Sequence, residues 1–268
     1  MSQLTERAYA KLNLALHVRG KLPDGRHRIE TIFAFCEDGD ELTAEPADDL
    51  SLSITGPFAD ALQANDDNLV LQAARTLRDA AYVTAGAALV LDKRLPVASG
   101  IGGGSADAGA ALRLLTRMWA TDPNVAENVA PALGADVRAC LRSQSCRGEG
   151  AGDQLEPIDL GLAGIPVLLT NPRIPLSTGA VFAGWDGVDG GPLGNWREGR
   201  NDLETPAIGL VPEIADVLGW LRGQPDATFV RMSGSGATCF AMFDDIAARD
   251  AAAGACPADW WHLATRLR

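Results

Sequence analysis

The chemically most distinctive part of the sequence is a glycine-rich run between a strand-like and a helix-like segment. Glycines allow positive φ angles and bring backbone N–H groups close to an anion, and the N-terminus of a following helix adds the positive end of its dipole. The run therefore predicts a loop that binds phosphate groups. It consists of Pro96, Val97, Ala98, Ser99, Gly100, Ile101, Gly102, Gly103, Gly104, Ser105 and Ala106.

This loop fits neither of the two common nucleotide-binding fingerprints. A P-loop has a lysine directly after its last glycine, and none follows here. The pattern G-x-G-x-x-G ends on Ser105 when counted from Gly100 and on Asp107 when counted from Gly102. A third phosphate-binding architecture is therefore expected. The alternative is a flexible linker, which is disfavoured because linkers rarely lie tightly between a strand and a helix.

A second group of polar residues lies on the first predicted strand. Apolar and other residues alternate with a period of two from Ala8 to Arg19, which is typical of a half-buried strand. The polar face of this strand carries Lys11 and Asn13 side by side. A turn follows at 22–25, where a proline restricts φ and a glycine tolerates the left-handed region.

The remaining segments must position these residues. Periodicity predicts strands at 29–35, 41–45, 50–54 and 87–91, and helices at 68–81, 105–118 and near 125–133. The second half predicts strands at 166–170, 228–232 and 237–243, a tight glycine turn at 233–236, and helices at 177–183, 203–208 and 212–222. The loop at 184–199 is either a lid or disordered.

This mixture of strands and helices predicts an α+β fold with a ligand-binding cleft between two layered domains. Several glycines near 158–164 suggest a boundary there, which gives domains at residues 1–160 and 161–268.

Composition restricts the class of protein. The chain has 268 residues, 47% of them hydrophobic, and a net charge of -12, which disfavours nucleic-acid binding. No basic start leads into an apolar run, and no stretch reaches the ~18 apolar residues of a membrane span, so a cytoplasmic protein without membrane partners is expected. Five cysteines without a C-x-x-C pair predict reduced thiols and disfavour a metal centre.

Four motifs taken in order resemble one enzyme superfamily. They are A-x-A-K-x-N-x-x-L at 8–16, P-x-x-x-G-I-G-G-G-S-A-D-A at 96–108, L-G-A-D-V at 133–137 and M-S-G-S-G-A-T at 232–238. Together they resemble the superfamily of galactokinase, homoserine kinase, mevalonate kinase and phosphomevalonate kinase. Within it, residues 24–27, 30–31 and 201–203 and the additional glycine of the loop are most similar to the 4-diphosphocytidyl-2-C-methyl-D-erythritol kinases. The resemblance extends from about Tyr9 to Phe243.

The resemblance implies a fold and a reaction. The implied fold is a two-domain small-molecule kinase, with an N-terminal domain like ribosomal protein S5, a ferredoxin-like C-terminal domain and the active site in the cleft. The implied reaction is phosphorylation of the 2-hydroxyl of the methylerythritol moiety in the non-mevalonate isoprenoid pathway, with ATP and Mg²⁺. In it, Asp136 would be the general base and Lys11 would polarise the acceptor hydroxyl. Without the resemblance, Lys11 reads as a solvated strand residue and Asp136 as a loop or capping aspartate.

Further roles follow from the same resemblance at the nucleotide end. Asn68 and Lys93 would flank the adenine and the phosphates, although Asn68 could simply cap a helix and Lys93 could be a surface residue. Ser105 would donate its hydroxyl to phosphate or magnesium, or cap its helix. Asp107 is expected to point away from phosphate or to meet magnesium, because a carboxylate repels phosphate. The sequence assigns no further magnesium ligand.

At the acceptor end, the resemblance implies that Asn13, His27, Thr178 and Phe182 bind substrate, with His27 and Phe182 at the cytosine. Arg26 stands in place of a tyrosine that usually stacks on cytosine, and its planar guanidinium can also stack on a base.

The substitution at Arg26, together with Arg138 in place of a proline, supports an alternative kinase of the same fold that acts on homoserine, mevalonate or a sugar. A nucleotide-binding regulator without turnover is a further alternative. The expected partners are ATP and a small-molecule substrate, and the expected state is a monomer or a weak homodimer.

Overall fold

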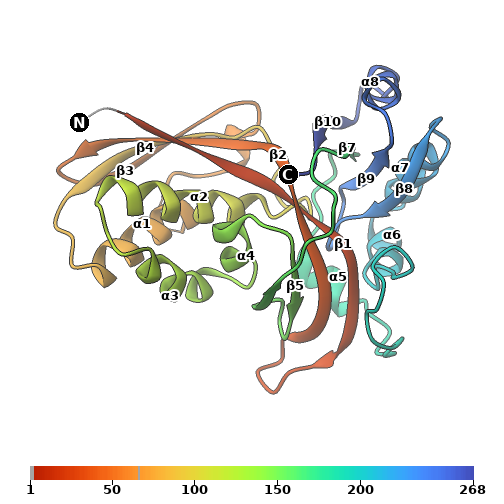
Figure 1. Ribbon diagram of the computed structural model, residues 1–268, viewed down its shortest axis with the longest axis horizontal. Coiled ribbons are helices and arrows are strands. Elements are labelled where there is room, and N and C mark those ends of the chain that lie inside the picture. Colours follow the sequence, from red (N-terminus) through yellow and green to blue (C-terminus); the bar gives the residue numbers. More distant parts are fainter. Residues whose placement is uncertain (1–2, 66) are drawn as a thin grey trace. The chain divides into compact units, whose positions relative to one another are not determined.

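The computed structural model describes residues 3–65 and 67–268, which form two compact units (Figure 1). The first unit contains the chain up to Ala10, Asp38–Val97 and Gly102–Ser143. The second contains Lys11–Glu37, Ala98–Ile101 and Gln144–Arg268. Two long paired strands, β1 (Leu4–Lys21) and β2 (His27–Ala47), contribute to both units.

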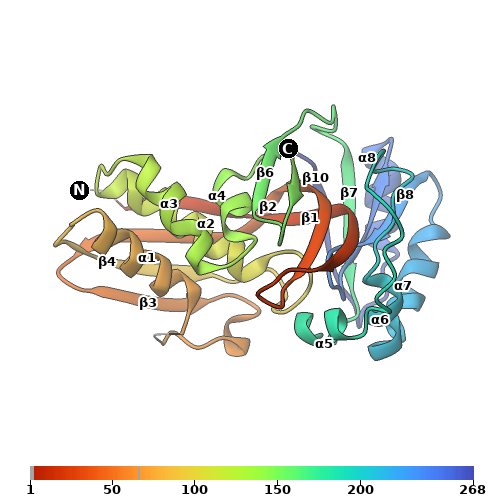
Figure 2. The ribbon, with the colours of Figure 1, turned by 90° about the horizontal axis from the view of Figure 1, so that it is seen from below.

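The first unit packs helices against one face of its strands. The end of β2 pairs antiparallel with β4 (Gly86–Asp92), which pairs parallel with β3 (Leu50–Thr55). The helices are α1 (Leu69–Ala80), α2 (Gly103–Met118), α3 (Pro123–Leu133) and α4 (Val137–Arg142), with a 3-10 turn at Ala59–Ala61. They gather together on one side of the strands (Figures 1 and 2). Inward residues such as Leu42, Leu89 and Leu91 form the core with Leu77 and Leu112.

The second unit contains an antiparallel sheet in the order β10-β7-β9-β8. These strands are β7 (Pro166–Asn171), β8 (Ala227–Met232), β9 (Cys239–Phe243) and β10 (Trp261–Arg266). The helices are α5 (Thr178–Ala183), α6 (Glu204–Leu210), α7 (Glu213–Arg222) and α8 (Ile246–Gly254). The start of β2 pairs with β5 (Cys146–Glu149), which pairs with β6 (Gln154–Pro157).

The predicted elements are mostly present, with several differences. β2 is one strand where two were predicted. Gly39 allows the strand to continue because it has no side chain, whereas a Cβ at this position would lie only 1.9 Å from the Ala8 carbonyl oxygen. β5, β6, α4, α8 and β10 were not predicted, because short segments carry little periodic signal. The compact units also differ from the expected division at residue 160, since residues 11–37 and 144–160 pack in the second unit.

A buried ionic cluster fastens the start of α2 to the strands of the first unit. The Lys93 ammonium donates to Asp40 over 2.6 Å and to Asp107 over 2.7 Å, and all three residues are at most 2% exposed. Asp40 also accepts backbone N–H groups of Arg94 and Leu95. Burial alone would lower the pKa of Lys93, but the two carboxylates raise it, so this lysine is held charged.

Asp107 is the member of the cluster with the most perturbed pKa. Burial, opposed by the charge of Lys93 and reinforced by that of Asp40, raises the pKa of Asp107 to about 7. One ammonium cannot neutralise two carboxylates, so a proton on Asp107 makes the cluster neutral.

A glycine allows α2 and α4 to pack at very short range. A Cβ on Gly109 would lie 2.7 Å from the Cys140 carbonyl carbon and 2.8 Å from the Leu141 nitrogen. Any side chain at this position must therefore displace the backbone of α4.

We predict that Asp107 makes folding stability depend on pH. Its pKa is higher in the folded than in the unfolded chain, so the folded state binds more protons and stability falls as pH rises from about 4 to about 7. Asp107→Asn removes this titration. Urea unfolding at about pH 5 and about pH 7.5 should show a decline smaller by on the order of 2 kcal/mol in the variant than in the unmodified protein.

The matched control is Asp79→Asn, because the Asp79 side chain is 77% exposed. It should retain the full decline. Equal declines in Asp107→Asn and the unmodified protein would contradict the prediction.

We also predict that Gly109→Ala destabilises the protein by about 1–3 kcal/mol, because overpacking forces the backbone of α4 to shift. The control is Gly219→Ala on α7, where a Cβ meets nothing within 4 Å. That change should be neutral or stabilising by up to about 1 kcal/mol, because alanine favours helix over glycine. Denaturant unfolding measures both, and equal effects would refute the close-packing explanation.

Candidate active site

The predicted phosphate-binding loop leads directly into α2. The helix begins at Gly103, two residues earlier than expected, and Gly102 occupies the N-cap position with a φ of 72°. Ser105 lies inside the first turn, so its alternative role as the helix cap is wrong. Ala98 and Gly100 also have positive φ angles, of 51° and 77°. Such backbone reversals let successive N–H groups converge on an anion.

The middle of this loop packs on the glycine turn at 233–236 within the second unit. The Ser233 hydroxyl donates to the Gly100 carbonyl over 3.0 Å, and the Thr238 N–H donates to Ser99 over 3.1 Å. A Cβ on Gly100 would lie 2.4 Å from the Ser233 carbonyl oxygen. The two predicted glycine motifs are therefore brought into direct backbone contact, and only glycine fits at position 100.

A cavity of about 390 Å³ adjoins the start of α2 in the first unit. It is lined by Asn68, Leu69, Gly104 and Asp107, together with Ala61, Leu62, Gln63, Asn65 and Asp67. Asn68 caps α1 by accepting from the Val70 N–H over 2.9 Å, so its capping role and its place at the cavity coexist.

Lys93 lies beneath the first turn of α2 and is not a surface residue. A Cβ on Gly103 would be 3.1 Å from the Lys93 ammonium nitrogen. This ammonium pairs with Asp40 and Asp107, so the Asp107 carboxylate faces the lysine inside the unit. The two carboxylates neutralise the ammonium, so Lys93 acts here by holding the first turn of α2 to the strands below it.

On β1, Lys11 and Asn13 share one face, as the period of two predicted. Lys11 donates from its ammonium to the Asn13 side-chain oxygen over 2.8 Å, and both residues are buried. The same ammonium lies 4.8 Å from the centre of the Phe33 ring. The backbone N–H of Lys11 donates to the Ile101 carbonyl of the loop over 3.0 Å, so this bond holds the loop against the strand.

Asp136 occupies the N-cap position of α4, but its side chain makes no capping hydrogen bond. The alternative reading of Asp136 as a capping aspartate is therefore wrong. The positive charge of nearby Arg138 is compensated, because its guanidinium donates to Glu127 over 3.0 Å. Arg142 binds the same carboxylate, and although burial opposes it, these two arginines lower the pKa of Glu127.

An aromatic group forms at the turn that follows β1. His27 stacks on Phe182 with ring centres 4.9 Å apart, and Trp185 meets His27 edge-on at 5.7 Å. Burial, and then the charge of Lys21, lower the pKa of His27. A neutral imidazole beside a phenyl ring offers both a stacking surface and a hydrogen-bonding edge.

Arg26 and Thr178 have partners outside this aromatic group. The Arg26 guanidinium donates to Asp24 over 2.8 Å and lies 3.8 Å from Asp153, and it is about half exposed. Thr178 shares a hydrogen bond of 3.0 Å with Ser235 of the glycine turn.

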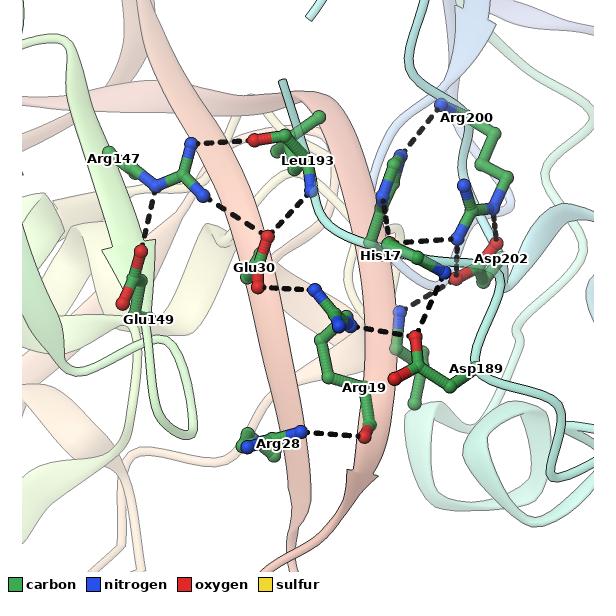
Figure 3. Close-up of polar contacts among 12 residues, drawn as sticks. His17, Arg19, Arg28, Glu30, Arg147, Glu149, Asp189, Leu193, Arg200 and Asp202 are labelled. Atoms are coloured by element: carbon green, nitrogen blue, oxygen red, sulfur yellow. Dashed lines mark hydrogen bonds and ion pairs between the residues drawn. The ribbon is translucent and has the colours of Figure 1, made fainter.

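The long loop at 184–199 is fastened to β1 and β2 by charged groups (Figure 3). Glu30 accepts from Arg19 over 2.6 Å, from Arg147 over 3.1 Å and from the Leu193 N–H over 2.6 Å. Arg19 also donates to Asp189 over 2.7 Å. Of the two sequence-based alternatives, a lid or disorder, these bonds exclude disorder.

His17 holds the end of the same loop (Figure 3). Its Nε2 accepts the Arg200 N–H over 3.2 Å, so Nδ1 carries the proton that faces the Gly191 carbonyl at 3.1 Å. Burial lowers the pKa of His17, which favours this neutral form.

Sequence reasoning missed several residues that position the site. Asn201 is buried and donates to the carbonyls of Met232 and Gly234 over 2.9 and 2.8 Å, which holds the glycine turn. Glu30, Thr31 and Asn201 stood in motifs that supported the resemblance, but nothing in their spacing assigned them a role. Ser233 stood within the predicted glycine turn, and the sequence likewise assigned it no role.

The part of the chain that the structure describes contains neither a metal-holding cluster nor a membrane-spanning helix. Within residues 3–65 and 67–268, no three His, Cys, Asp or Glu side chains are grouped to hold a metal ion. In the same described ranges, no helix has both the length and the apolar character to cross a membrane.

Comparisons with known proteins agree with this arrangement. Residues 68–146 match the family described as GHMP kinases N terminal domain, and residues 190–260 match GHMP kinases C terminal. The 4-diphosphocytidyl-2-C-methyl-D-erythritol kinase of Rhizorhabdus wittichii is 55% identical, over 98% of this chain and 94% of its own. That of Novosphingobium aromaticivorans is 53% identical, over 99% and 93%.

Solved structures give the same result. A crystal structure of 4-(cytidine 5'-diphospho)-2C-methyl-D-erythritol kinase matches with a TM-score of 0.86 and 30% identity, over 98% of this chain and 99% of that one. Homoserine kinase from Cytophaga hutchinsonii matches with a TM-score of 0.73 and 14% identity, over 100% and 95%, which shows the fold alone. The expected α+β kinase fold is confirmed, and the matches favour the cytidyl kinases over the same-fold alternatives. The chain belongs to the GHMP kinase family and, within it, to the 4-diphosphocytidyl-2-C-methyl-D-erythritol kinases.

Proposed function

We propose that the protein transfers the γ-phosphate of ATP to the 2-hydroxyl of 4-diphosphocytidyl-2-C-methyl-D-erythritol. The observation that carries this proposal is the 55% identity to a kinase of that name over 98% of the chain. The local geometry supports it, because phosphoryl transfer requires mainly positioning and charge stabilisation, and the glycine loop offers both.

The loop at 96–106 is the proposed cradle for the ATP phosphates. Its positive-φ residues and the N-terminus of α2 present backbone N–H groups, and Lys93, paired with Asp107 of α2, holds that N-terminus in place from below. The neighbouring cavity, which Asn68 and Gly104 line, is the proposed place for the adenosine part of the nucleotide.

Asp136 is the proposed general base, and Lys11 the proposed cation that polarises the acceptor hydroxyl. A carboxylate is a suitable acceptor for the proton of a hydroxyl group, and Asp136 stands in the L-G-A-D-V motif at the start of α4. Asn13 accepts a hydrogen bond from the Lys11 ammonium and so directs it. Both roles concern the same acceptor hydroxyl, whose proton leaves as the phosphoryl group arrives.

Magnesium is the proposed companion of ATP. It prefers oxygen ligands and commonly binds through substrate phosphates with few protein groups. This fits the described residues, in which no three His, Cys, Asp or Glu side chains are grouped to hold a metal ion. The partly exposed Ser105 hydroxyl in the first turn of α2 is the proposed protein ligand of this ion or of a phosphate. Bound magnesium would neutralise charge on the transferring phosphates.

The aromatic group at His27 is the proposed cytosine site, with Phe182 as its stacking surface and Thr178 nearby on the same helix. Arg26, which is exposed and engaged by Asp24, is proposed to meet the diphosphate or the base at the rim. The cytoplasmic location and the monomeric or weakly dimeric state stay predictions from the sequence.

The first test of this function is phosphorus NMR of the protein with magnesium-ATP and 4-diphosphocytidyl-2-C-methyl-D-erythritol. A new phosphomonoester signal is expected. Asp136→Asn should slow its appearance by roughly 10²–10⁴-fold, the usual contribution of a general base. Asp79→Asn, a change of the same type at an exposed site, should leave the rate unchanged.

If the unmodified protein instead phosphorylates homoserine, mevalonate or a sugar in preference, the proposed substrate is wrong. If Asp136→Asn turns over at the normal rate, the substrate assignment stands and the base is another residue.

We also predict that His27→Ala and Phe182→Ala each raise KM for the cytidyl substrate by about 5- to 150-fold, because loss of base stacking costs roughly 1–3 kcal/mol. KM for ATP should not change, because neither residue lines the proposed nucleotide cavity. His262→Ala removes an exposed histidine on β10 and serves as the control. Steady-state kinetics with each substrate varied in turn makes the measurement, and a rise in KM for ATP instead would place the cytosine elsewhere.

A further inference from the structure

A buried hydroxyl group stands behind the Lys11–Asn13 pair in the second unit. It belongs to Thr31 on β2, whose side chain is fully buried. The Asn13 side-chain nitrogen donates to Thr31 Oγ1 over 2.8 Å, and Thr31 Oγ1 donates to the Ala15 carbonyl over 2.7 Å. With the 2.8 Å bond from Lys11 to Asn13, three hydrogen bonds run in series from the lysine to the backbone of β1.

The direction of these bonds determines how the Asn13 amide is turned. A hydroxyl group has one proton, and that of Thr31 is used by the Ala15 carbonyl, so Thr31 can offer Asn13 only lone pairs. The Asn13 NH₂ group must therefore face Thr31, which leaves the amide oxygen for the Lys11 ammonium. With the amide reversed, the NH₂ group would face the ammonium, and no hydrogen bond could form because both groups are donors.

Surrounding groups keep Thr31 in place. Thr31 and Phe33 are two residues apart on β2 and therefore face the same side of the strand. A Cβ on Gly148 of β5 would lie 2.7 Å from the Phe33 ring and 3.1 Å from the Thr31 methyl carbon. β5 thus presses directly on both side chains, and the Phe33 ring lies 4.8 Å from the Lys11 ammonium.

We propose that Thr31 is a positioning residue for the kinase reaction, whose hydroxyl orients the Asn13 amide and thereby places the Lys11 ammonium. This inference rests on the role proposed above for Lys11. Thr31 acts through two other residues and does not itself meet a substrate.

Two variants separate the hydroxyl from the packing. Thr31→Val keeps the branched shape and loses the hydroxyl, and Thr31→Ser keeps the hydroxyl and loses the methyl group. Thr31→Val should lower kcat by about 10-fold or more with little change in either KM, because a misplaced catalytic group costs rate. Thr31→Ser should stay within about threefold of the unmodified protein. Thr228→Val deletes a hydroxyl that donates to the Met242 carbonyl on the far sheet and should leave kcat unchanged.

A double-mutant cycle tests the path through Lys11. If Thr31 acts through the ammonium, adding Thr31→Val to Lys11→Met should reduce kcat little further, because the two changes remove one interaction. Additive losses would overturn the proposal, as would equal losses in Thr31→Val and Thr31→Ser or a normal kcat in Thr31→Val.

Crystal structures of Thr31→Val and Thr31→Ser give a readout that does not depend on activity. The contact between the Lys11 ammonium and the Asn13 oxygen should be lost in the first variant and kept in the second. An inactive unmodified protein would refute the proposed function, and these structures would still decide whether Thr31 positions Lys11. An intact contact in Thr31→Val would show that it does not.

Discussion

The close approach of two backbones, the loop at 98–101 and the turn at 233–236, is the constraint on which the second unit's part of the site depends. A Cβ on Gly234 would lie 2.9 Å from the Gly100 carbonyl oxygen and 3.0 Å from the Asn13 side-chain oxygen. Polar backbone groups this close must be paired when buried, and the Ser233 hydroxyl pairs two of them by donating to Gly100 and accepting the Asn13 N–H. Through Ser233, the turn therefore fixes the loop and the strand that carries Lys11 in position relative to each other.

The first unit solves a different problem, which is to bury a charged lysine beneath the proposed phosphate-binding loop. An isolated buried ammonium would lose its proton, but two carboxylates hold the Lys93 ammonium charged. The cost is an excess of negative charge, which the raised pKa of Asp107 relieves. The cluster thus joins the strands to the start of α2 and keeps its cation at neutral pH.

The long loop at 184–199 shows how charged side chains can hold a segment in place without the hydrogen bonds of a helix or a strand. Two arginines and a backbone N–H meet at Glu30, and a neutral His17 bridges two backbone groups further along (Figure 3). Glu30 and Thr31 are neighbours on β2, so their side chains point to opposite faces of the strand. Glu30 therefore holds the long loop, and Thr31 faces Asn13.

The sequence by itself determined the local features of this protein. The period of two placed Lys11 and Asn13 on one face of a strand, glycines marked the loop and the turn where positive φ is required, and the ordered motifs identified the kinase family. Only the tertiary structure decided which groups these residues meet. The burial of Lys93 against Asp40, 53 positions away, and the pairing of Asn13 with Ser233, 220 positions away, leave no local pattern. Periodicity reports which face of an element is buried, whereas the partner of a polar group depends on how distant segments pack.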